Sequence, residues 1–349
     1  MASPQDSMTY EKSGVSIQTA DEAKELMSKS LRTDNPRVLN KFGAFGSVID
    51  GVFSEYKHPV LVLKMEEPGS KQLLAAQHGR LPGIGYDLVN HLINDVVVMG
   101  AKPIAVLDTI VCGKLEKDVV VALVDPVAKA CRDQNCDLVG GETSEQPRVI
   151  PSGAYILSAA AVGVADKDKV IDGSKIKPGD AVIAIASNGL HTNGYTLVRS
   201  LLDANKDLAA NIVTGKETFL DAVLKPHTCY NLALQELFPK GTLTGLAHIT
   251  GGGIEGNLIR VLPSNVEAVI DLSKIEILPV FKMIREIGKV PDADMLRSLN
   301  NGVGLVAVLP ASTVLEATKI LAKYGHKAYP IGEIKSGAKR VRFENSLMW

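Results

Sequence analysis

Two successive series of strand-like and helix-like runs constrain the fold of this 349-residue chain more than any other feature. In the first series, short β-branched runs bounded by Gly or Pro predict buried strands over residues 59–65, 105–113, 137–141 and 154–165. Apolar residues at helical spacing predict helices over residues 87–99 and 118–133. This mixture predicts an α/β domain of the α+β type, with helices packed on a mixed β-sheet.

The second series follows a turn-rich segment, VIDGSKIKPGD, at residues 170–180. It predicts strands over residues 181–186, 268–272, 303–309 and 328–334, and helices over residues 194–204, 253–261, 280–288 and 313–324. A chain of 349 residues exceeds the usual size of one core. We therefore expect two domains, residues 1–169 and residues 170–349.

Charge and composition exclude several classes of partner. The 38 Lys and Arg residues nearly balance the 39 Asp and Glu residues, so nothing attracts nucleic acid or an anionic membrane. The most apolar run, residues 154–165, is too short to span a bilayer and predicts a buried strand. The N-terminal MASPQDSMTYEKSG lacks a secretion signal, and the four cysteines form no CxxC pair. These features predict a cytoplasmic protein with reduced thiols.

The strand at 59–65 runs directly into the sequence EEPGSK, residues 66–71. Carboxylates followed by a glycine turn and a lysine can hold a metal and a phosphate. A solvated turn is the alternative. The preceding loop NKFGAFGSV, with Gly43 and Gly46, is flexible enough to lie across a ligand, although such a pattern is more often a simple turn.

The helix at 87–99 places Asp87, His91, Asn94 and Asp95 on one polar face. No Lys or Arg occurs from residue 87 to residue 100, which favours metal or ligand contact slightly over a solvated face. The segment DLVGGETSEQP ends a strand on two glycines beside carboxylates. That arrangement suits magnesium carrying phosphates or, equally, an exposed turn.

Two further segments combine histidine with a predicted helix start. In NGLHTNGYTLVR, His191 precedes Thr192 and Asn193, where a helix N-terminus can bind phosphate and a histidine can transfer protons. A simple N-cap is the alternative reading, and both can hold together. In GLAHITGGGIEGNLIR, three glycines between a strand and a helix indicate an anion site without a P-loop or dinucleotide fingerprint.

In their order along the chain, these segments resemble the phosphoribosylformylglycinamidine cyclo-ligases, the aminoimidazole ribonucleotide synthetases of purine biosynthesis. The similarity runs from Tyr10 to Pro310, and GGETSE and HTNGYTLVR are its most specific parts. The resemblance implies two α/β domains that dimerise through their N-terminal sheets. It also implies ATP-dependent ring closure: the γ-phosphoryl group activates the formyl oxygen of formylglycinamidine ribonucleotide, the amidine nitrogen attacks, and phosphate leaves.

The resemblance implies roles for particular residues, with ATP and Mg²⁺ on the N-terminal side and the ribonucleotide on the C-terminal side. It assigns catalysis to Lys71, His191 and Asn193. It assigns nucleotide binding to Gly43, Gly46, Gly69, Ser70, Lys71, Asn94, Asp95, Asp108, Gly140, Gly141, Glu142 and Thr143. It assigns substrate binding to His191, Thr192, Asn193, His248, Thr250, Gly251, Gly252 and Asn300. It assigns the metal to Glu66, Asp95 and Glu142.

The segment EEPGSK departs from the family pattern, which usually reads Asp-Gly-Val-Gly-Thr-Lys. Glu67 replaces the first glycine and Pro68 replaces the valine, so the path of the loop must differ. We expect Glu66 to reach the metal, Lys71 to lie near a phosphate and Glu67 to turn away. Two alternatives stay open: a nucleotide-binding homologue with lost or altered catalysis, and another ATP-dependent enzyme of the same superfamily.

Overall fold

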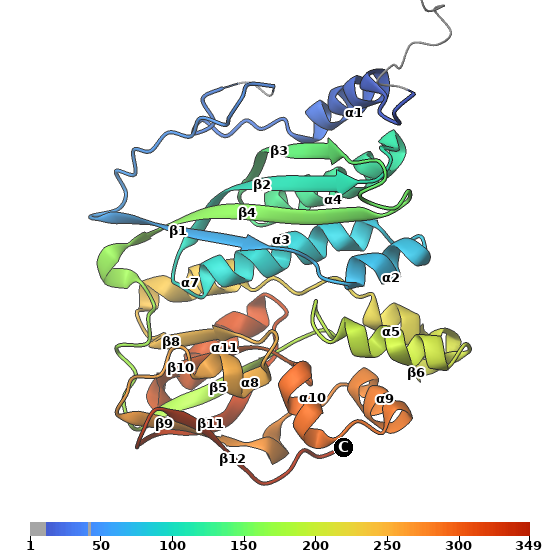
Figure 1. The fold of residues 1–349 in the computed structure, drawn as a ribbon. Helices are drawn as coiled ribbons and strands as arrows, with labels where there is room; N and C mark the ends of the chain where they lie inside the picture. Colours follow the sequence, from blue (N-terminus) through green and yellow to red (C-terminus); the bar gives the residue numbers. More distant parts are fainter. Residues whose placement is uncertain (1–11, 41–42) are drawn as a thin grey trace, which may run out of the picture.

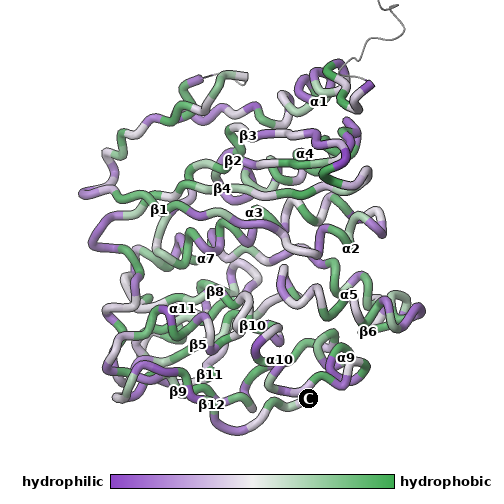
Figure 2. The backbone as a smooth tube through the Cα atoms, viewed as in Figure 1, coloured by the Kyte–Doolittle hydropathy of each residue, from purple (hydrophilic) through white to green (hydrophobic). Residues whose placement is uncertain are grey.

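The computed structural model describes residues 12–40 and 43–349, which form two sheets with their helices (Figure 1). The polar N-terminus up to residue 11, including Tyr10 of the similar region, lies outside the described residues. Lys41 and Phe42 of the predicted flexible loop also lie outside them. Hydrophobic residues occur along the strands of both sheets, interspersed with hydrophilic ones (Figure 2).

The first sheet has four strands in the order β1-β4-β2-β3. They are β1 (Pro59–Glu66), β2 (Lys102–Cys112), β3 (Asp137–Glu145) and β4 (Tyr155–Asp166). The β2–β3 pair is parallel and the other two pairs are antiparallel, so the sheet is mixed as predicted. The long apolar run at residues 154–165 forms β4, a central strand of the sheet, as the sequence predicted.

Two helices pack on the first sheet, α3 (Pro82–Val97) directly and α4 (Lys117–Asp133) beside it, with α1 (Ile17–Ser30) next to α4. The apolar stripe of α3 is fully buried at Leu88, Leu92 and Val96. The helix leaves its polar face free to meet the second half of the chain. Both helices predicted in this half are confirmed, whereas α1 and the short helix α2 (Lys71–Gln77) were missed.

The other face of the first sheet is apolar and open. Side chains alternate along β1, so Leu61, Leu63 and Met65 point away from α3 and are 58%, 72% and 64% exposed. Leu107 of β2 is also exposed on this side. Apolar surface of this kind usually marks a contact with another molecule.

The second sheet has six strands in the order β12-β9-β11-β5-β10-β8. They are β5 (Asp180–Ala186), β8 (Gly245–His248), β9 (Val266–Asp271), β10 (Val303–Pro310), β11 (Ala328–Ser336) and β12 (Arg340–Glu344). Only the β12–β9 pair is parallel among the described strands of this sheet, so it too is mixed. The strands predicted here are confirmed, and β12 was missed.

Seven α-helices belong to the described second half: α5 (Tyr195–Ala204), α6 (Phe219–Val223), α7 (Asn231–Leu237), α8 (Gly253–Leu258), α9 (Pro279–Gly288), α10 (Asp292–Ser298) and α11 (Val314–Lys323). A two-stranded ribbon pairs β6 (Ile212–Thr214) with β7 (Glu217–Thr218). The four predicted helices are present, although α8 ends three residues earlier than expected. The sequence pattern missed α6, α7 and α10, which are at most seven residues long.

The two halves share a core. Leu88 and Leu92 of α3 belong to the same buried cluster as Leu190 and Tyr195 of the second half. The boundary predicted after residue 169 falls in the connection between β4 and β5. Among residues 12–40 and 43–349, none of the helices has the length and apolar character needed to cross a bilayer.

Candidate active site between the two sheets

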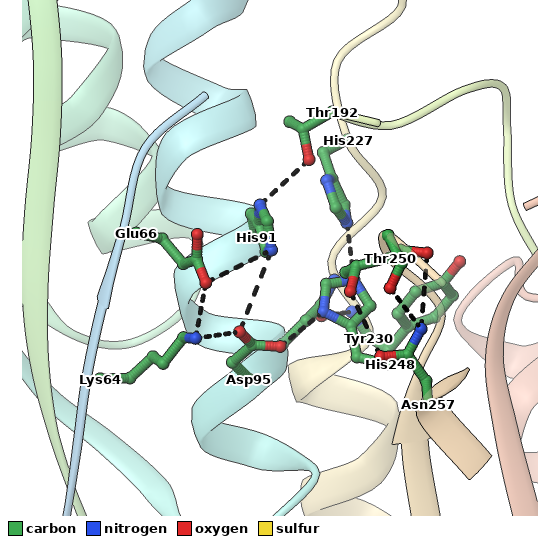
Figure 3. A network of polar contacts seen from close by, with 12 residues as sticks. Lys64, Glu66, His91, Asp95, Thr192, His227, Tyr230, His248, Thr250 and Asn257 are labelled. Atoms are coloured by element: carbon green, nitrogen blue, oxygen red, sulfur yellow. Dashed lines mark hydrogen bonds and ion pairs between the residues drawn. The ribbon is translucent and has the colours of Figure 1, made fainter. Parts of the chain in front are cut away.

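Four of the seven histidines meet where α3 faces the second half of the chain (Figure 3). His91 comes from α3, His191 from the loop before α5, His227 from the loop before α7, and His248 from the end of β8. All four are buried. The imidazoles of His191 and His227 are stacked with ring centroids 3.8 Å apart.

Asp95, His248 and His227 form a chain of hydrogen bonds (Figure 3). Asp95 Oδ1 lies 2.7 Å from His248 Nδ1, and His248 Nε2 lies 3.0 Å from His227 Nε2. Because an ionised carboxylate only accepts, His248 Nδ1 must donate; in the neutral ring Nε2 then accepts from His227 Nε2. This assigns His227 Nδ1 as unprotonated, and that atom has no partner among the described residues.

Burial and charge set the protonation of this chain. Burial opposes ionisation of Asp95, but the hydrogen bond from His248 and the charges of His248, His91 and Lys64 outweigh it and lower the pKa of Asp95. Burial, followed by the charge of His248, lowers the pKa of His91 to about 3. Burial also lowers the pKa of His191 and His227. Near neutral pH the site thus contains an ionised Asp95 with neutral His91, His191 and His227.

Lys64 places its ammonium between two carboxylates of the site. Its Nζ atom lies 2.5 Å from Glu66 Oε1 and 3.0 Å from Asp95 Oδ2. Lys64 and Glu66 are two residues apart on β1, so both side chains point toward α3. His91 Nε2 lies 3.8 Å from Glu66 Oε1 and 3.9 Å from Asp95 Oδ2, while His91 Nδ1 contacts the Thr192 hydroxyl at 3.0 Å.

Lys71 connects the two halves of the chain. It begins α2 (Lys71–Gln77) and is fully buried. Its Nζ atom donates to Asp87 Oδ1 at 2.8 Å and to the carbonyl oxygens of His191 and Lys225 at 3.0 and 2.5 Å. Three acceptors match the three donors of an ammonium, so no donor is left for a phosphate. We expected Lys71 to lie near a phosphate, whereas the three partners of its ammonium here lie within the protein.

The amides of α3 position the loop that carries His227. Asn90 Nδ2 donates to the carbonyl oxygen of His227, and Asn94 bonds the carbonyl oxygen of Thr228 and the N–H of Tyr230. The side-chain amide of Asn94 therefore bonds backbone groups of the protein, whereas we expected it to contact the nucleotide.

Asn300 plays a comparable part in the second half. It bonds the Ser187 hydroxyl, the Gly189 carbonyl and the Gly302 N–H, so its polar atoms hold two loops together. We expected Asn300 to contact the substrate.

Several predicted nucleotide residues lie on β2 and β3, at the edge of the first sheet that is opposite β1. The Ser47 hydroxyl bonds the Val139 carbonyl at 2.6 Å and holds the loop with Gly43 and Gly46 against β3. Asp108 lies opposite Gly141 on the neighbouring strand. Burial raises the pKa of Asp108 to about 7. Gly140 adjoins Ser47, and Glu142 and Thr143 continue β3.

The predicted substrate residues lie close to the histidine cluster. Among them, Asn193 Nδ2 is buried without a partner in the described chain. A Cβ on Gly251 would lie 3.4 Å from Asn193 Oδ1. Thr250 and Gly251 enter α8, where Asn257 Nδ2 bonds their carbonyl oxygens and that of Gly253. Gly252 has a φ of 97°, which glycine adopts without strain.

The structure brings together only part of the predicted set. Glu66, Asp95, His191, Thr192 and His248 share one site. Lys64 and His227 also belong there but were missed by sequence reasoning, and Asp87 and His91 were noticed only as part of a polar face. The polar alternation of β1 was a signal for Lys64. His227 lies in a loop without a periodic pattern, and no signal in the sequence indicated that it belongs to the site.

The three predicted metal ligands do not form a common magnesium site. Glu66 and Asp95 meet, but the Lys64 ammonium lies between them. Glu142 is exposed on β3, which is separated from β1 by β4 and β2. The residues present therefore do not fit a Mg²⁺ ion shared by these three carboxylates.

Comparison with known proteins connects this geometry to a family. Residues 58–165 match the family described as AIR synthase related protein, N-terminal domain, and residues 177–343 match the corresponding C-terminal domain. The chain belongs to the AIR synthase family. A relative named phosphoribosylformylglycinamidine cyclo-ligase, from Methylobacillus flagellatus, is 40% identical over 338 residues, covering 96% of this chain and 97% of its own. One from Carboxydothermus hydrogenoformans is 39% identical over 337 residues, covering 96% and 98%.

Solved structures of other members of this fold are similar in shape. Thiamine-monophosphate kinase from Stenotrophomonas maltophilia K279a superposes with a TM-score of 0.70 at 16% identity, covering 96% of this chain and 98% of its own. Hydrogenase maturation protein HypE, in complex with ATP, gives 0.70 at 20% identity, covering 95% and 93%. These likenesses confirm the predicted fold class of two domains, each with a mixed sheet.

Proposed function

We propose that the protein is a phosphoribosylformylglycinamidine cyclo-ligase: it uses ATP to convert formylglycinamidine ribonucleotide into aminoimidazole ribonucleotide, ADP and phosphate. The similarity of 40% over nearly the whole chain supports this activity. The observation that carries it is the buried hydrogen-bonded chain of Asp95, His248 and His227 between the two halves.

The reaction needs a proton acceptor beside the closing ring. The γ-phosphoryl group passes to the formyl oxygen and releases ADP. The amidine nitrogen then attacks the activated carbon, the carbon–oxygen bond to phosphate breaks, and the nitrogen loses a proton. His227 Nδ1 accepts this proton, the proton on His227 Nε2 passes to His248 Nε2, and the ionised Asp95 stabilises the resulting imidazolium of His248. The relay needs no side-chain movement because its hydrogen bonds are already formed.

His191 and Asn193 are proposed to contact the ribonucleotide. Both ring nitrogens of His191 and the Nδ2 atom of Asn193 are buried and lack partners within the described residues. Such polar atoms carry a free-energy penalty unless a ligand satisfies them. Thr192 lies between these two residues in the chain, and a Cβ on Gly251 would lie 3.4 Å from Asn193 Oδ1. Thr250 and Gly252 are proposed to complete this site.

ATP is proposed to bind on the first sheet, where the loop with Gly43 and Gly46 adjoins β3. Asp108, Gly140, Gly141, Glu142 and Thr143 lie at this edge of the sheet, and Gly69 and Ser70 follow β1. Mg²⁺ held by the ATP phosphates would neutralise part of their charge. A structural neighbour of this fold was solved in complex with ATP, which is consistent with nucleotide use here.

The protein is proposed to act as a cytoplasmic homodimer that pairs the open faces of the first sheets. Leu61, Leu63 and Met65 are apolar and more than half exposed on this face. Joining two copies removes this surface from water, which is favourable by roughly 25 cal/mol per Å² of apolar area.

The decisive experiment incubates the purified protein with ATP, Mg²⁺ and formylglycinamidine ribonucleotide and measures aminoimidazole ribonucleotide and ADP. We expect both products in equal amounts, and a loss of turnover of at least about 100-fold in Asp95→Asn. A folded protein that binds ATP without forming either product would contradict the proposal and favour a nucleotide-binding homologue. Formation of ADP without the ribonucleotide would indicate another ATP-dependent enzyme.

A further inference from the structure

The contacts of Lys64 differ from those of an ordinary surface ion pair. Its side chain is 35% exposed, and those of Glu66 and Asp95 are 21% and 19% exposed. The ammonium lies within 3.0 Å of one oxygen from each acid, and the acids come from different elements, β1 and α3. Figure 3 shows these three side chains converging beside His91.

The acids and the imidazole around this ammonium are of the kinds that bind a divalent cation. Glu66 Oε1 and Asp95 Oδ2 lie 3.8 and 3.9 Å from His91 Nε2, and the Lys64 ammonium lies between the two oxygens. Two carboxylates and an imidazole suit Mn²⁺ and similar ions. His91 Nδ1 contacts the Thr192 hydroxyl, which leaves Nε2 for the ion. Lys64 already supplies a positive charge at this position.

We propose that Lys64 is a tethered cation: its ammonium takes the position between Glu66, Asp95 and His91 that a divalent metal would otherwise occupy, so these residues bind no divalent ion. Two cations so close together would repel each other. Removing the ammonium leaves two acids facing each other with an imidazole beside them. Lys64 is thus a positioning residue that holds Asp95 for His248. This inference does not depend on the reaction that the site performs.

The test measures Mn²⁺ binding to the full-length protein without nucleotide or ribonucleotide, by calorimetry and by electron paramagnetic resonance of free Mn²⁺. The variant Lys64→Met keeps the length of the side chain and removes its charge. We expect it to gain one Mn²⁺ site per chain, at least about tenfold tighter than any binding by the unmodified protein. Mn²⁺ should raise the thermal midpoint of this variant only.

Three further variants separate this effect from general loss of positive charge. Lys64→Arg keeps the charge and should gain no site. Lys64→Met combined with Glu66→Gln removes a ligand and should lose the new site. Lys335→Met is the matched control, because Lys335 and Glu333 are also two residues apart on one strand, with a 2.9 Å ion pair. It should bind no additional Mn²⁺.

Two results would overturn the proposal. One is a folded Lys64→Met protein that gains no Mn²⁺ site. The other is a Mn²⁺ site in the unmodified protein that disappears in Glu66→Gln, and this second measurement decides the matter even where Lys64→Met does not fold. Neither uses the proposed reaction, so its failure and that of the proposed function are distinguishable.

Discussion

Replacing Lys71 with Met tests the buried connection between the two halves. The substitution conserves most of the volume and removes an ammonium that bonds Asp87 and two backbone carbonyls of the second half. Asp87 is fully buried and then keeps only the N–H of His227 as a bonded partner within the described chain. The variant therefore contains an uncompensated buried carboxylate.

The size of the effect follows from the burial of the pair. Removing one partner of a buried ion pair costs about 3–5 kcal/mol. Burial raises the pKa of Asp87 to about 6 even beside Lys71, whose charge lowers it, so the pKa is higher still in the variant. The folded variant then binds a proton that the unfolded chain, with a carboxyl pKa of 3.8, releases. Its stability therefore falls as pH rises above about 4, and the loss relative to the unmodified protein is larger at pH 8 than at pH 5.

The assay is urea unfolding followed by circular dichroism at pH 5 and pH 8. We expect a loss of unfolding free energy of about 3–5 kcal/mol at pH 8 and a smaller loss at pH 5. Adding Asp87→Asn removes the stranded charge and should recover part of the loss at pH 8. Equal losses at both pH values, or a double variant less stable than Lys71→Met, would refute this reasoning.

Three other predictions address the site and the assembly. His191→Asn, which tolerates the φ of 62° found here, should lower turnover at least about 100-fold with little change in the thermal midpoint; unchanged turnover removes His191 from the site. Asp108→Asn should stabilise the protein by at most about 4 kcal/mol at pH 8 and leave its stability unchanged near pH 3, because burial raises the pKa of this acid to about 7. Urea unfolding at both pH values measures the effect, and an equal gain in stability at both would contradict the prediction. Leu63→Glu should give a monomer by light scattering at micromolar concentration, whereas the unmodified protein should give a dimer; a monomeric unmodified protein contradicts the proposed assembly.

The local patterns in the sequence were sufficient for most of the longer strands and helices, although α1 and β12 were missed. The apolar run at residues 59–65 predicted a buried strand, and the strand is present as β1 but one of its faces is exposed; the stripe of Leu88, Leu92 and Val96 predicted α3. Short helices such as α6 and α7 were not predicted, because a helix of fewer than two full turns shows no clear hydrophobic period.

The site could be predicted only where a motif carried it. Asp95, His191 and His248 were found on recognisable segments, whereas His227 is held beside them by Asn90 at its carbonyl group and by Asp87 at its N–H. The direction of Lys71 also depends on tertiary structure: its three acceptors come from α3 and from two loops more than 100 residues away. The spacing of residues along the sequence could therefore not predict these contacts.

The packing around Gly141 affects how relatives of this protein can be interpreted. Gly141 is exposed, yet a Cβ there would lie 1.9 Å from Asp108 Oδ1 and 2.6 Å from the backbone oxygen of Asp108. Replacing the acid removes only the first clash, because the backbone oxygen stays. A descendant can therefore lose the carboxylate and its chemistry while still being obliged to keep the glycine. When relatives are compared, a glycine at position 141 therefore indicates only that the backbone follows the same path. Only the residue at position 108 indicates whether the carboxylate is present.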